Sequence, residues 1–428
     1  MGASLPKQMN VEPAARPLRI AFVYSRLPFP MMRGDQLTVS HLLSFLAARG
    51  HTVDFHTLAT GGKVEPAQRE WLDKACRTVR FYDQPKIAML LGMVRALFTG
   101  IPFQVGLFHN AKLAADLEAG IGAGDYDIAY CYYLRTSPAI PDPTRSSAKG
   151  WRSFLAMQLS QTLNARRIFE NETNLAKRIF YFFEAKRLAR YEARIWRKFS
   201  RTVLIGPADV AAIREECRRQ GMPEIDNWVY GAHGTDTERF QPATREEMVP
   251  NRVVFSGSML YQPNIQAALW FVQRCWPAIR AAVPDAEFII QGRDPVPEIQ
   301  RLAGKDGIVV TGTVPDVGAM IRSATVCVNP MLAAGGMQNK LIEYMACGKA
   351  TVATAVANEG IRAPADTLIS ADEPEAISEA IIALLRDPDA AHALGQRARA
   401  YASRDWTWEK HFLDLEQAFY DSLEDRGQ

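Results

Sequence analysis

Cysteine is scarce in this sequence, and its spacing excludes two common uses. The 428 residues contain six cysteines, at Cys76, Cys131, Cys217, Cys275, Cys327 and Cys347. None forms a CxxC pair or a Cys/His cluster with the spacing of a zinc site. The scattered residues therefore fit reduced thiols in a cytosol better than a disulfide framework.

The sequence also lacks a strong charge of one sign and a long uninterrupted apolar run. The formal net charge is +3, which argues against a nucleic-acid-binding protein, whose basic charge is larger and clustered. The most apolar stretch, Ile87–Phe108, is interrupted by Arg95, Gly100 and Pro102, so we expect no membrane span there. The first 16 residues lack the apolar core of a signal peptide. We therefore expect a cytoplasmic protein with a loose N-terminal tail.

Two motifs that would indicate other chemistries are missing. No G-x-G-x-x-G follows the first apolar run, which argues against a dehydrogenase. The acidic sequence Asp125-Tyr126-Asp127 precedes an expected strand, whereas a metal-binding D-x-D motif would follow one. We therefore expect no essential metal.

Short apolar runs alternate with segments of helical periodicity, and this alternation occurs twice. In the first series, an expected strand at 19–24 is followed by a helix at 36–49 and strands at 52–58 and 127–133. A second series begins at Arg252. Strand–helix–strand units form parallel sheets, so the sequence predicts an α/β protein with two Rossmann-like doubly wound domains that face each other across a cleft. The expected helices of the second series include 264–283, 338–347, 375–385 and 404–423.

These patterns suggest boundaries for the domains. We expect a tail at 1–16, a first domain at 17–240, a second domain at 241–405, and a C-terminal helix at 406–428 that packs on the first domain. Within the first domain, 151–199 is predicted as a mostly helical insertion rich in bases and aromatics.

The most informative segment is Asn329–Thr354, where an expected strand is followed by a glycine-bearing loop and a helix. Free backbone N–H groups at such a loop and helix start favour an anion such as a diphosphate, so Gly335 and Gly336 are candidate site residues. Lys340 lies in the first helical turn, where a cation opposes the helix dipole unless it reaches a phosphate. Glu343 lies one turn further, where a carboxylate can accept hydrogen bonds from a ribose diol.

This segment resembles the signature of family-4 retaining glycosyltransferases, E-x7-E followed by A-M-A-C-G-x-P-V-V. Glu343 falls on the second glutamate, which in the family holds the ribose, whereas Gly335 stands where the first glutamate contacts the donor sugar. The variant G-x-Q-N-K-x-x-E is similar to a branch associated with bacterial exopolysaccharide and cell-surface glycan assembly. The resemblance implies the GT-B fold and assigns catalytic or donor-binding roles to Gly335, Gly336, Met337, Gln338, Asn339, Lys340 and Glu343.

Other segments of the second domain extend the resemblance. The sequence from Ser256 to Asn264 resembles the glycine loop that opens the donor domain, but it lacks the usual basic pair. We therefore assign phosphate binding to the backbone near Gly257 and Ser258, with Lys340 and Arg293 as cations. Gly312, Thr313 and Val314 resemble the segment that lies against the nucleobase.

The first domain matches more loosely. Arg33, Gly34 and Asp35 stand where the family has a glycine loop that touches acceptor or donor phosphate. Many relatives place a histidine at the end of a strand near the reacting sugar, but this chain has tyrosines and Arg135 around 130–134 instead. His233 lies next to a segment resembling N-G-V-D-x-x-x-F, and a structural role for it is favoured over a catalytic one.

The resemblance implies retaining, metal-independent glycosyl transfer from a nucleotide-diphosphate sugar, either a UDP- or a GDP-sugar, with no resident cofactor. A UDP-sugar epimerase and a non-catalytic partner subunit of the same fold remain alternatives. The missing glutamate at Gly335 and the missing basic pair favour the non-catalytic subunit. Lys340 and Glu343 argue against the epimerase.

Bases and aromatics gather between residues 166 and 198. Such a surface could lie on anionic lipid at the inner face of the cytoplasmic membrane, which would suit a polyprenyl-linked glycan acceptor. The alternative is a packed helix whose bases pair with Glu170, Glu172, Glu184 and Glu192. The bases are Arg166, Arg167, Lys177, Arg178, Lys186, Arg187, Arg190, Arg194, Arg197 and Lys198.

Overall fold

The computed structural model describes residues 9, 11–31, 33–59, 64–144, 146, 148–171, 174–231, 233–332 and 337–425. The chain divides into two compact units: unit 1 comprises Met1–Ala232 with His411–Gln428, and unit 2 comprises His233–Lys410. Within the described ranges, no helix is long and apolar enough to cross a membrane.

Unit 1 is built on a parallel seven-stranded sheet with the order β3-β2-β1-β4-β5-β6-β7. The order reverses between β1 and β4, and open α/β sheets bind ligands at the carboxyl ends of the strands at such a switch point. The strands are β1 (Arg19–Tyr24), β2 (Thr52–Ala59), β3 (Thr78–Asp83), β4 (Ile128–Tyr132), β5 (Arg152–Gln158), β6 (Arg201–Leu204) and β7 (Trp228–Tyr230).

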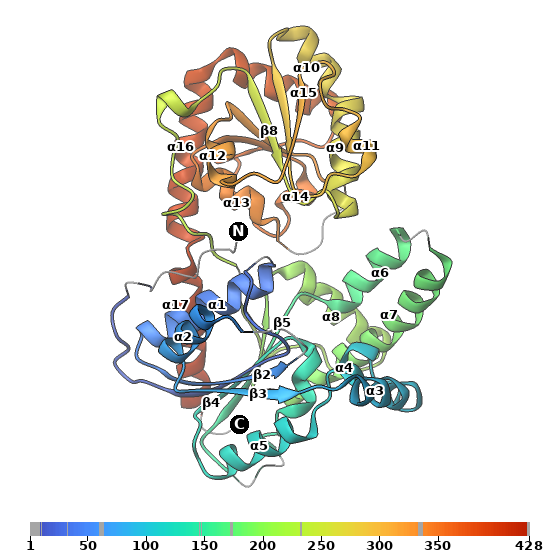
Figure 1. The fold of residues 1–428 in the computed structure, drawn as a ribbon, viewed down its shortest axis with the longest axis vertical. Helices are drawn as coiled ribbons and strands as arrows, with labels where there is room; N and C mark the ends of the chain where they lie inside the picture. The colour runs from blue at the N-terminus through green and yellow to red at the C-terminus, as the bar shows by residue number, and fades with distance from the viewer. Residues whose placement is uncertain are drawn as a thin grey trace. The chain divides into compact units, whose positions relative to one another are not determined.

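Helices cover this sheet, and two of them extend away from it. Figure 1 shows α6 and α7 side by side, with α3 and α4 next to α7. Arg187 of α7 joins these pairs, because its Nη1 donates to the carbonyl of Ala96 at 2.6 Å. The helices are α1 (Gly34–Ala48), α2 (Pro66–Ala75), α3 (Lys86–Thr99), α4 (Phe103–Leu107), α5 (Ala111–Gly122), η1 (Leu134–Ala139), α6 (Gln161–Asn171), α7 (Leu175–Ile195), η2 (Trp196–Lys198) and α8 (Pro207–Arg219).

The helical insertion predicted at 151–199 begins too early. Residues Arg152–Gln158 form β5, a strand between β4 and β6 with six of its seven residues buried. A strand covered on both faces has an apolar run without alternation, so its pattern does not distinguish it from a buried helix. The helical part of the segment is α6, α7 and η2.

The C-terminal helix packs on unit 1, as expected. In α17 (Trp408–Glu424), Phe419 lies against Phe154 of β5 with ring centroids 4.8 Å apart, and Glu416 pairs with Arg49 at 2.8 Å. The expected single helix at 404–423 is wrong, however. The preceding helix α16 (Pro388–Asp405) ends before Trp406, and Thr407 forms a β-bridge with Thr235 instead of continuing the helix.

Unit 2 contains a parallel six-stranded sheet with the order β10-β9-β8-β11-β12-β13. Its strands are β8 (Arg252–Ser256), β9 (Glu287–Gln291), β10 (Ile308–Gly312), β11 (Val326–Asn329), β12 (Ala350–Ala353) and β13 (Ile369–Ser370). The helices besides α16 are η3 (Arg245–Glu247), α9 (Gln262–Arg274), α10 (Trp276–Ala282), α11 (Pro297–Gln300), α12 (Val317–Arg322), α13 (Asn339–Ala346), α14 (Ala355–Asn358) and α15 (Pro374–Arg386). The chain thus has two Rossmann-like units, as predicted.

Two expectations for unit 2 are corrected. The helix expected at 264–283 is broken at Cys275 into α9 and α10, because Pro277 has no N–H to continue the hydrogen-bond ladder. Residues up to 240 were assigned to the first domain, yet the segment from His233 lies in unit 2. Arg399 of α16 holds it there, since its Nη1 donates to the carbonyl of Phe240 at 2.7 Å.

Candidate functional site

The loops that follow β8 and β9 lie against each other at the carboxyl edge of the unit 2 sheet. The Gly257 N–H donates to the Gln291 carbonyl at 2.9 Å, and the Met259 N–H donates to the Arg293 carbonyl at 3.1 Å. A Cβ atom on Gly292 would lie 1.7 Å from the Gly257 carbonyl oxygen, so only glycine permits this approach. The predicted residues Gly257, Ser258 and Arg293 are therefore brought together by backbone contacts.

Lys340 joins this loop pair from the first turn of α13. Its Nζ donates to Oδ1 of Asn264 at 2.8 Å and lies 4.4 Å from the centre of the Phe255 ring. The Asn264 Nδ2 in turn donates to the Ser258 carbonyl at 3.0 Å. Asn264 was not predicted as a site residue, although it lies in the first turn of α9 directly after Pro263.

Lys340 and Glu343 are charged groups in a desolvated place. Burial lowers the pKa of Lys340 to about 7, against a weaker opposing effect of Glu343. Burial also raises the pKa of Glu343, while Arg239 and Lys340 oppose that rise. Among the described residues, Arg239 and Lys340 act on the Glu343 carboxylate only through their charge, without a hydrogen bond to it. Both side chains are therefore available to a ligand.

The start of α13 is anchored to the sheet and carries further polar groups. The Tyr344 hydroxyl accepts the Ser256 N–H at 2.7 Å, which fixes the helix against the end of β8. Gln338 is buried, and the Oδ1 of Asn339 has no partner in the described part of the chain. Met337 is partly buried beside them.

Two more buried polar groups at this edge lack partners. Asn329, the last residue of β11, is 0% exposed, and neither its Oδ1 nor its Nδ2 is hydrogen-bonded within the described chain. The Oε1 of Gln291, the last residue of β9, also has no hydrogen-bond partner among the described residues. Buried polar groups are nearly always satisfied, so unpaired ones at the ligand-binding edge of a sheet indicate atoms that a ligand would pair. Asn329 was not predicted, because its only signal is a polar residue at the end of an apolar run.

The remaining predicted residues of unit 2 have different outcomes. Gly335 and Gly336 lie outside the described residues. Gly312 ends β10 with a φ of +64°, and Val314 is partly buried while Thr313 is exposed. His233 lies edge-on to Trp408 with ring centroids 6.2 Å apart.

In unit 1, the predicted loop residues lie at the start of α1. Arg33 and Gly34 are exposed, whereas Asp35 is buried. The Tyr24 hydroxyl donates to Asp35 at 2.7 Å, and Arg26 approaches the same carboxylate at 3.5 Å. Asp35 therefore anchors the first turn of α1 to the end of β1, and Arg33 and Gly34 are left as the accessible part of this loop.

Arg135 follows β4 at the same edge of the unit 1 sheet. Its guanidinium lies 5.5 Å from the Tyr133 ring centre and 5.4 Å from that of Phe108, and its Nε donates to Gln104 at 3.3 Å. Burial and the nearby Arg26 lower its pKa. Arg135 lines a cavity of about 320 Å³ between α4, α6 and α7.

The acidic sequence at 125–127 lies at the opposite edge of that sheet. Asp127 accepts the Arg19 N–H at 2.8 Å and pairs with the Arg19 guanidinium at 2.8 Å. It thus fixes the amino end of β1. Within the described ranges, no three His, Cys, Asp or Glu side chains are grouped to hold a metal ion.

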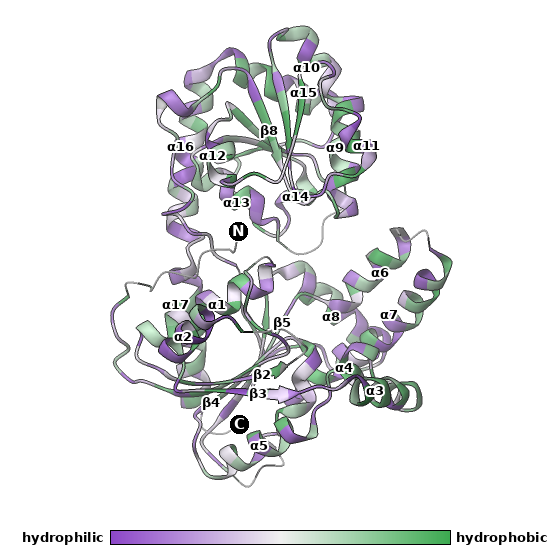
Figure 2. Ribbon diagram, in the orientation of Figure 1, coloured by the Kyte–Doolittle hydropathy of each residue, from purple (hydrophilic) through white to green (hydrophobic). Residues whose placement is uncertain are grey.

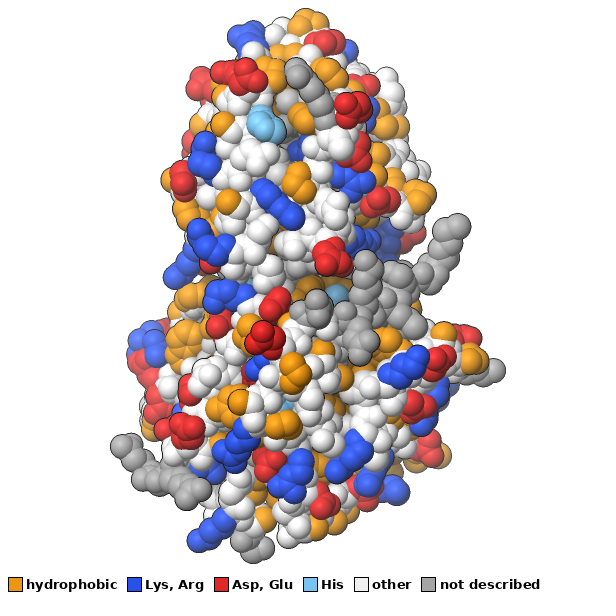
Figure 3. Space-filling view, turned by 90° about the vertical axis from the view of Figure 1, so that its left-hand side faces the viewer, with side chains coloured by type: hydrophobic (Ala, Val, Ile, Leu, Met, Phe, Trp, Pro, Cys, Tyr) orange, Lys and Arg blue, Asp and Glu red, His pale blue; other side chains and the backbone are white. Residues whose placement is uncertain are grey.

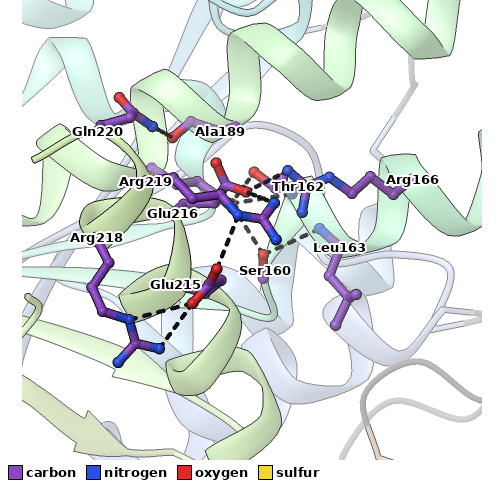
Figure 4. A network of polar contacts seen from close by, with 11 residues as sticks. Ser160, Thr162, Leu163, Arg166, Ala189, Glu215, Glu216, Arg218, Arg219 and Gln220 are labelled. Carbon is purple, nitrogen blue, oxygen red and sulfur yellow. Dashed lines mark hydrogen bonds and ion pairs between the residues drawn. The ribbon is translucent and has the colours of Figure 1, made fainter.

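Several bases of the 166–198 segment are engaged inside unit 1. Figure 4 shows the network in which Glu216 of α8 pairs with Arg166 and Arg219. Lys198 donates to the Ser137 carbonyl at 3.1 Å, and Arg187 to that of Ala96. Some of the bases in this segment therefore have a structural role within unit 1.

Sequence comparison connects unit 2 to a known family. Residues 250–387 match the family described as "Glycosyl transferases group 1", so the unit carries a domain of that type. A Klebsiella pneumoniae "uncharacterized 44.6 kDa protein in cps region" is 21% identical over 80% of this chain and 84% of that protein. A Corynebacterium glutamicum GDP-mannose-dependent monoacylated α-(1-6)-phosphatidylinositol monomannoside mannosyltransferase is 26% identical over 41% of this chain and 51% of that protein.

Solved structures show the same fold over nearly the whole chain. Anabaena HepE in complex with UDP has a TM-score of 0.64 at 14% identity, covering 94% of this chain and 100% of that one. WaaG, a glycosyltransferase involved in lipopolysaccharide biosynthesis, has a TM-score of 0.57 at 16% identity, covering 93% and 98%. The two units therefore have the GT-B glycosyltransferase fold.

Proposed function

We propose that this protein is a family-4-like retaining glycosyltransferase that moves a sugar from a UDP- or GDP-sugar to a glycan acceptor. The acceptor is carried on a lipid, and the reaction belongs to bacterial polysaccharide or cell-surface glycan biosynthesis. The observation that carries the proposal is the pair Lys340 and Glu343, two partly buried charged groups at the carboxyl edge of the unit 2 sheet without an ion pair between them.

A nucleoside diphosphate would satisfy the groups at this edge. The diphosphate takes the Lys340 ammonium and the N–H groups of the loop after β8, with Arg293 as a second cation. The ribose diol donates to Glu343. The amide of Asn329 and the oxygens of Gln291 and Asn339 are neutral polar atoms that suit the hydroxyls of a sugar or ribose.

Retention requires that the new bond form on the same face of the anomeric carbon as the bond that breaks. The leaving diphosphate oxygen accepts the proton of the acceptor hydroxyl, so the protein positions the reactants and stabilises the charge on the leaving group. Lys340 performs the second task. In this metal-independent mechanism, Arg293 and the backbone dipoles of the loop after β8 assist Lys340 in stabilising that charge. Nuclear magnetic resonance of the product gives the anomeric configuration directly, and inversion would contradict this assignment.

The family match over residues 250–387 supports transferase over epimerase chemistry, and the Corynebacterium relative is a mannosyltransferase with a lipid-linked acceptor by its name. Gly335 stands where family members have a glutamate that contacts the donor sugar, so this chain recognises the sugar through other groups.

Membrane association of unit 1 is supported by the charges of α7. Its two acids, Glu184 and Glu192, are buried and accept backbone N–H groups, so they do not neutralise the surface bases. The exposed charged side chains of this helix are therefore all basic: Lys177, Arg178, Lys186, Arg190 and Arg194. In contrast, the face in Figure 3 mixes acidic and basic side chains.

The neighbouring helix α3 supplies apolar surface. Figure 2 shows α3 as hydrophobic along its length, and no acid occurs in the sequence between Asp83 and Asp116. A cationic face with exposed apolar side chains suits an anionic bilayer surface. The exposed apolar residues are Ile87, Leu90, Leu91, Val94, Leu97 and Phe98 of α3 with Leu175, Ile179, Phe180, Phe182 and Phe183 of α7, and we name them the α3–α7 face.

A thermal-shift screen with UDP, GDP, ADP and their sugars tests the donor site. A ligand at 100 times its Kd adds about 2.7 kcal/mol to the free energy of unfolding. We expect one nucleotide family to stabilise the wild type but not Glu343→Ala, while Glu298→Ala, an exposed acid in the same unit, responds like the wild type. No stabilisation by any nucleotide would refute the donor site and favour a non-catalytic protein.

A further inference from the structure

A cavity in unit 1 connects the α3–α7 face with the carboxyl edge of the sheet. Its volume is about 320 Å³, which lies within the range of ligand pockets. Phe180 lines the cavity and is also 41% exposed, so it belongs to both the cavity and the α3–α7 face. Met93 of α3 lines it as well. The cavity is thus continuous with the surface proposed to meet the bilayer.

Most of the cavity wall is apolar. Leu107 of α4, Ile168 of α6 and Leu188 of α7 contribute branched side chains, and Phe103 stacks on Phe180 with ring centroids 5.4 Å apart. Glu184 also lines the cavity, but its oxygens accept the N–H groups of Phe103 and Gln104. Its carboxylate is therefore occupied by the start of α4, and an apolar chain can lie along the rest of the wall.

One end of the cavity is cationic. Arg135 lies there with its Nε bonded to Gln104, and its two terminal nitrogens donate to no residue in the described part of the chain. A guanidinium that binds a carboxylate or phosphate normally uses these two nitrogens in a forked contact. Arg26 lies nearby, and Asp35 pairs with it at 3.5 Å and accepts the Tyr24 hydroxyl, whereas Arg135 has no ion-pair partner in the described part of the chain. The cluster therefore has an uncompensated positive charge.

We propose that this cavity binds the lipid portion of a lipid-phosphate acceptor, with its phosphate on Arg135 and the adjoining hydrocarbon between α4, α6 and α7. The arrangement lets the hydrocarbon enter from the α3–α7 face while the phosphate lies at the carboxyl edge of β4, beside Tyr133 and the α1 loop. The inference rests on the proposed function, because it names the acceptor class of that reaction and the residues that hold it.

Binding of farnesyl phosphate to the full chain, measured by titration calorimetry below the micelle concentration of the lipid, tests the inference. We expect saturable binding of one molecule per chain, weaker binding of farnesol, and no binding of inorganic phosphate. Arg135→Gln should weaken binding about tenfold or more, because a charged hydrogen bond is lost. Arg197→Gln, an exposed base of the same unit, is the matched control and should bind like the wild type.

Filling the cavity gives a second, independent variant. Ala165 of α6 lines it and is buried, so Ala165→Phe should block the hydrocarbon. If that protein does not fold, judged by circular dichroism and its melting temperature, Ile168→Trp at the same wall replaces it. Equal binding of inorganic phosphate, or farnesyl phosphate binding that both variants leave unchanged, would overturn the inference. The thermal stabilisation of the same variants by nucleotide is measured in parallel. A variant that loses lipid binding but keeps this stabilisation has lost the lipid site alone, whereas a wild type without nucleotide stabilisation would contradict the proposed donor site.

Discussion

The Nζ of Lys340 lies 2.8 Å from Oδ1 of Asn264, a neutral partner, although the lysine is buried enough for its pKa to fall to about 7. A buried ammonium is normally stabilised by a carboxylate. An amide oxygen and an aromatic ring hold this one in place without cancelling its charge. The hydrogen bond to Asn264 therefore holds the Lys340 ammonium beside the loop after β8, where its charge can bind an anion.

Replacing Lys340 should separate binding from stability. In Lys340→Met we expect stabilisation by the nucleotide to disappear, because the cation that faces the diphosphate is gone. The ligand-free protein should be as stable as the wild type or more stable by about 1–3 kcal/mol near neutral pH, since a desolvated charge is removed. Chemical denaturation with and without nucleotide measures both quantities. Lys305→Met, an exposed lysine of the same unit, should change neither. Unchanged nucleotide binding in Lys340→Met would contradict the assignment.

The pKa of Lys340 also gives the pH dependence of donor binding. The ligand-free ammonium titrates near 7, and a bound diphosphate raises its pKa, so binding takes up a proton above that pH. The affinity for a nucleotide sugar, whose diphosphate diester does not titrate in this range, should therefore be constant below about pH 6 and fall from about pH 7 to about pH 9, by at most tenfold per pH unit. Calorimetry in buffers of different ionisation enthalpy would detect the proton uptake. An affinity that stays constant from pH 6 to pH 9 in the wild type would show that Lys340 does not face the phosphate.

The contact between the β8 and β9 loops predicts a strong effect of a single methyl group. Gly292→Ala places a Cβ 1.7 Å from the Gly257 carbonyl, so the two loops must separate. We expect a loss of about 1–3 kcal/mol in the free energy of unfolding and a weaker affinity for nucleotide. Gly122→Ala in α5 has open space around its Cβ and should be neutral or stabilising by about 0.5–1 kcal/mol. A Gly292→Ala protein with wild-type stability would mean that the loops are not held as described.

The sequence predicted the alternation of strands and helices because a parallel sheet covered by helices imposes that order. It missed β5, whose residues are buried on both faces, and it did not predict β3 or α2–α5 between the second and fourth strands. The break at Cys275 was missed because helical periodicity continues on both sides of Pro277. Long apolar runs identified buried strands such as β1 and β4, whereas β3 and α2, which have few buried residues, were not predicted.

The predicted part of the candidate site consists of residues assigned from local motifs, including Gly257 and Ser258 after β8 and the pair Lys340 and Glu343. Lys340 and Glu343 share one helix turn, but Asn264 is 76 residues from Lys340, and no local pattern indicates that pairing. Asn329 was missed for a different reason: its side chain is completely buried and has no hydrogen-bond partner in the part of the chain that the structure describes, which is a three-dimensional property. Arg135 was noted only as standing where relatives have histidine, and its cavity is lined by residues of α3, α4, η1, α6 and α7, which are far apart in the sequence.

Removal of divalent metals should leave the proposed transfer reaction intact. Asp127 is engaged with Arg19 at the amino edge of the unit 1 sheet, away from the carboxyl edges where ligands bind, so the D-x-D sequence is not available as a metal ligand pair. Lys340 and backbone dipoles then carry the charge stabilisation. Initial rates with and without EDTA provide the measurement. A loss of activity that Mn²⁺ restores would show that a metal takes part.

The α3–α7 face should bind anionic membranes through charge and apolar area together. In flotation with vesicles of phosphatidylcholine, we expect the protein to float only when phosphatidylglycerol is included and to be released by salt, because screening weakens the attraction of the bases on α7. Phe98 is 86% exposed, so Phe98→Glu should weaken binding with little effect on stability, and Lys177→Glu with Arg178→Glu should weaken it further. Arg301→Glu on unit 2 makes a comparable charge change at an exposed site and should float like the wild type.

Equal flotation of all these variants would place the membrane contact elsewhere. Absence of flotation in the wild type would remove the membrane from the proposed function and leave the donor site unaffected.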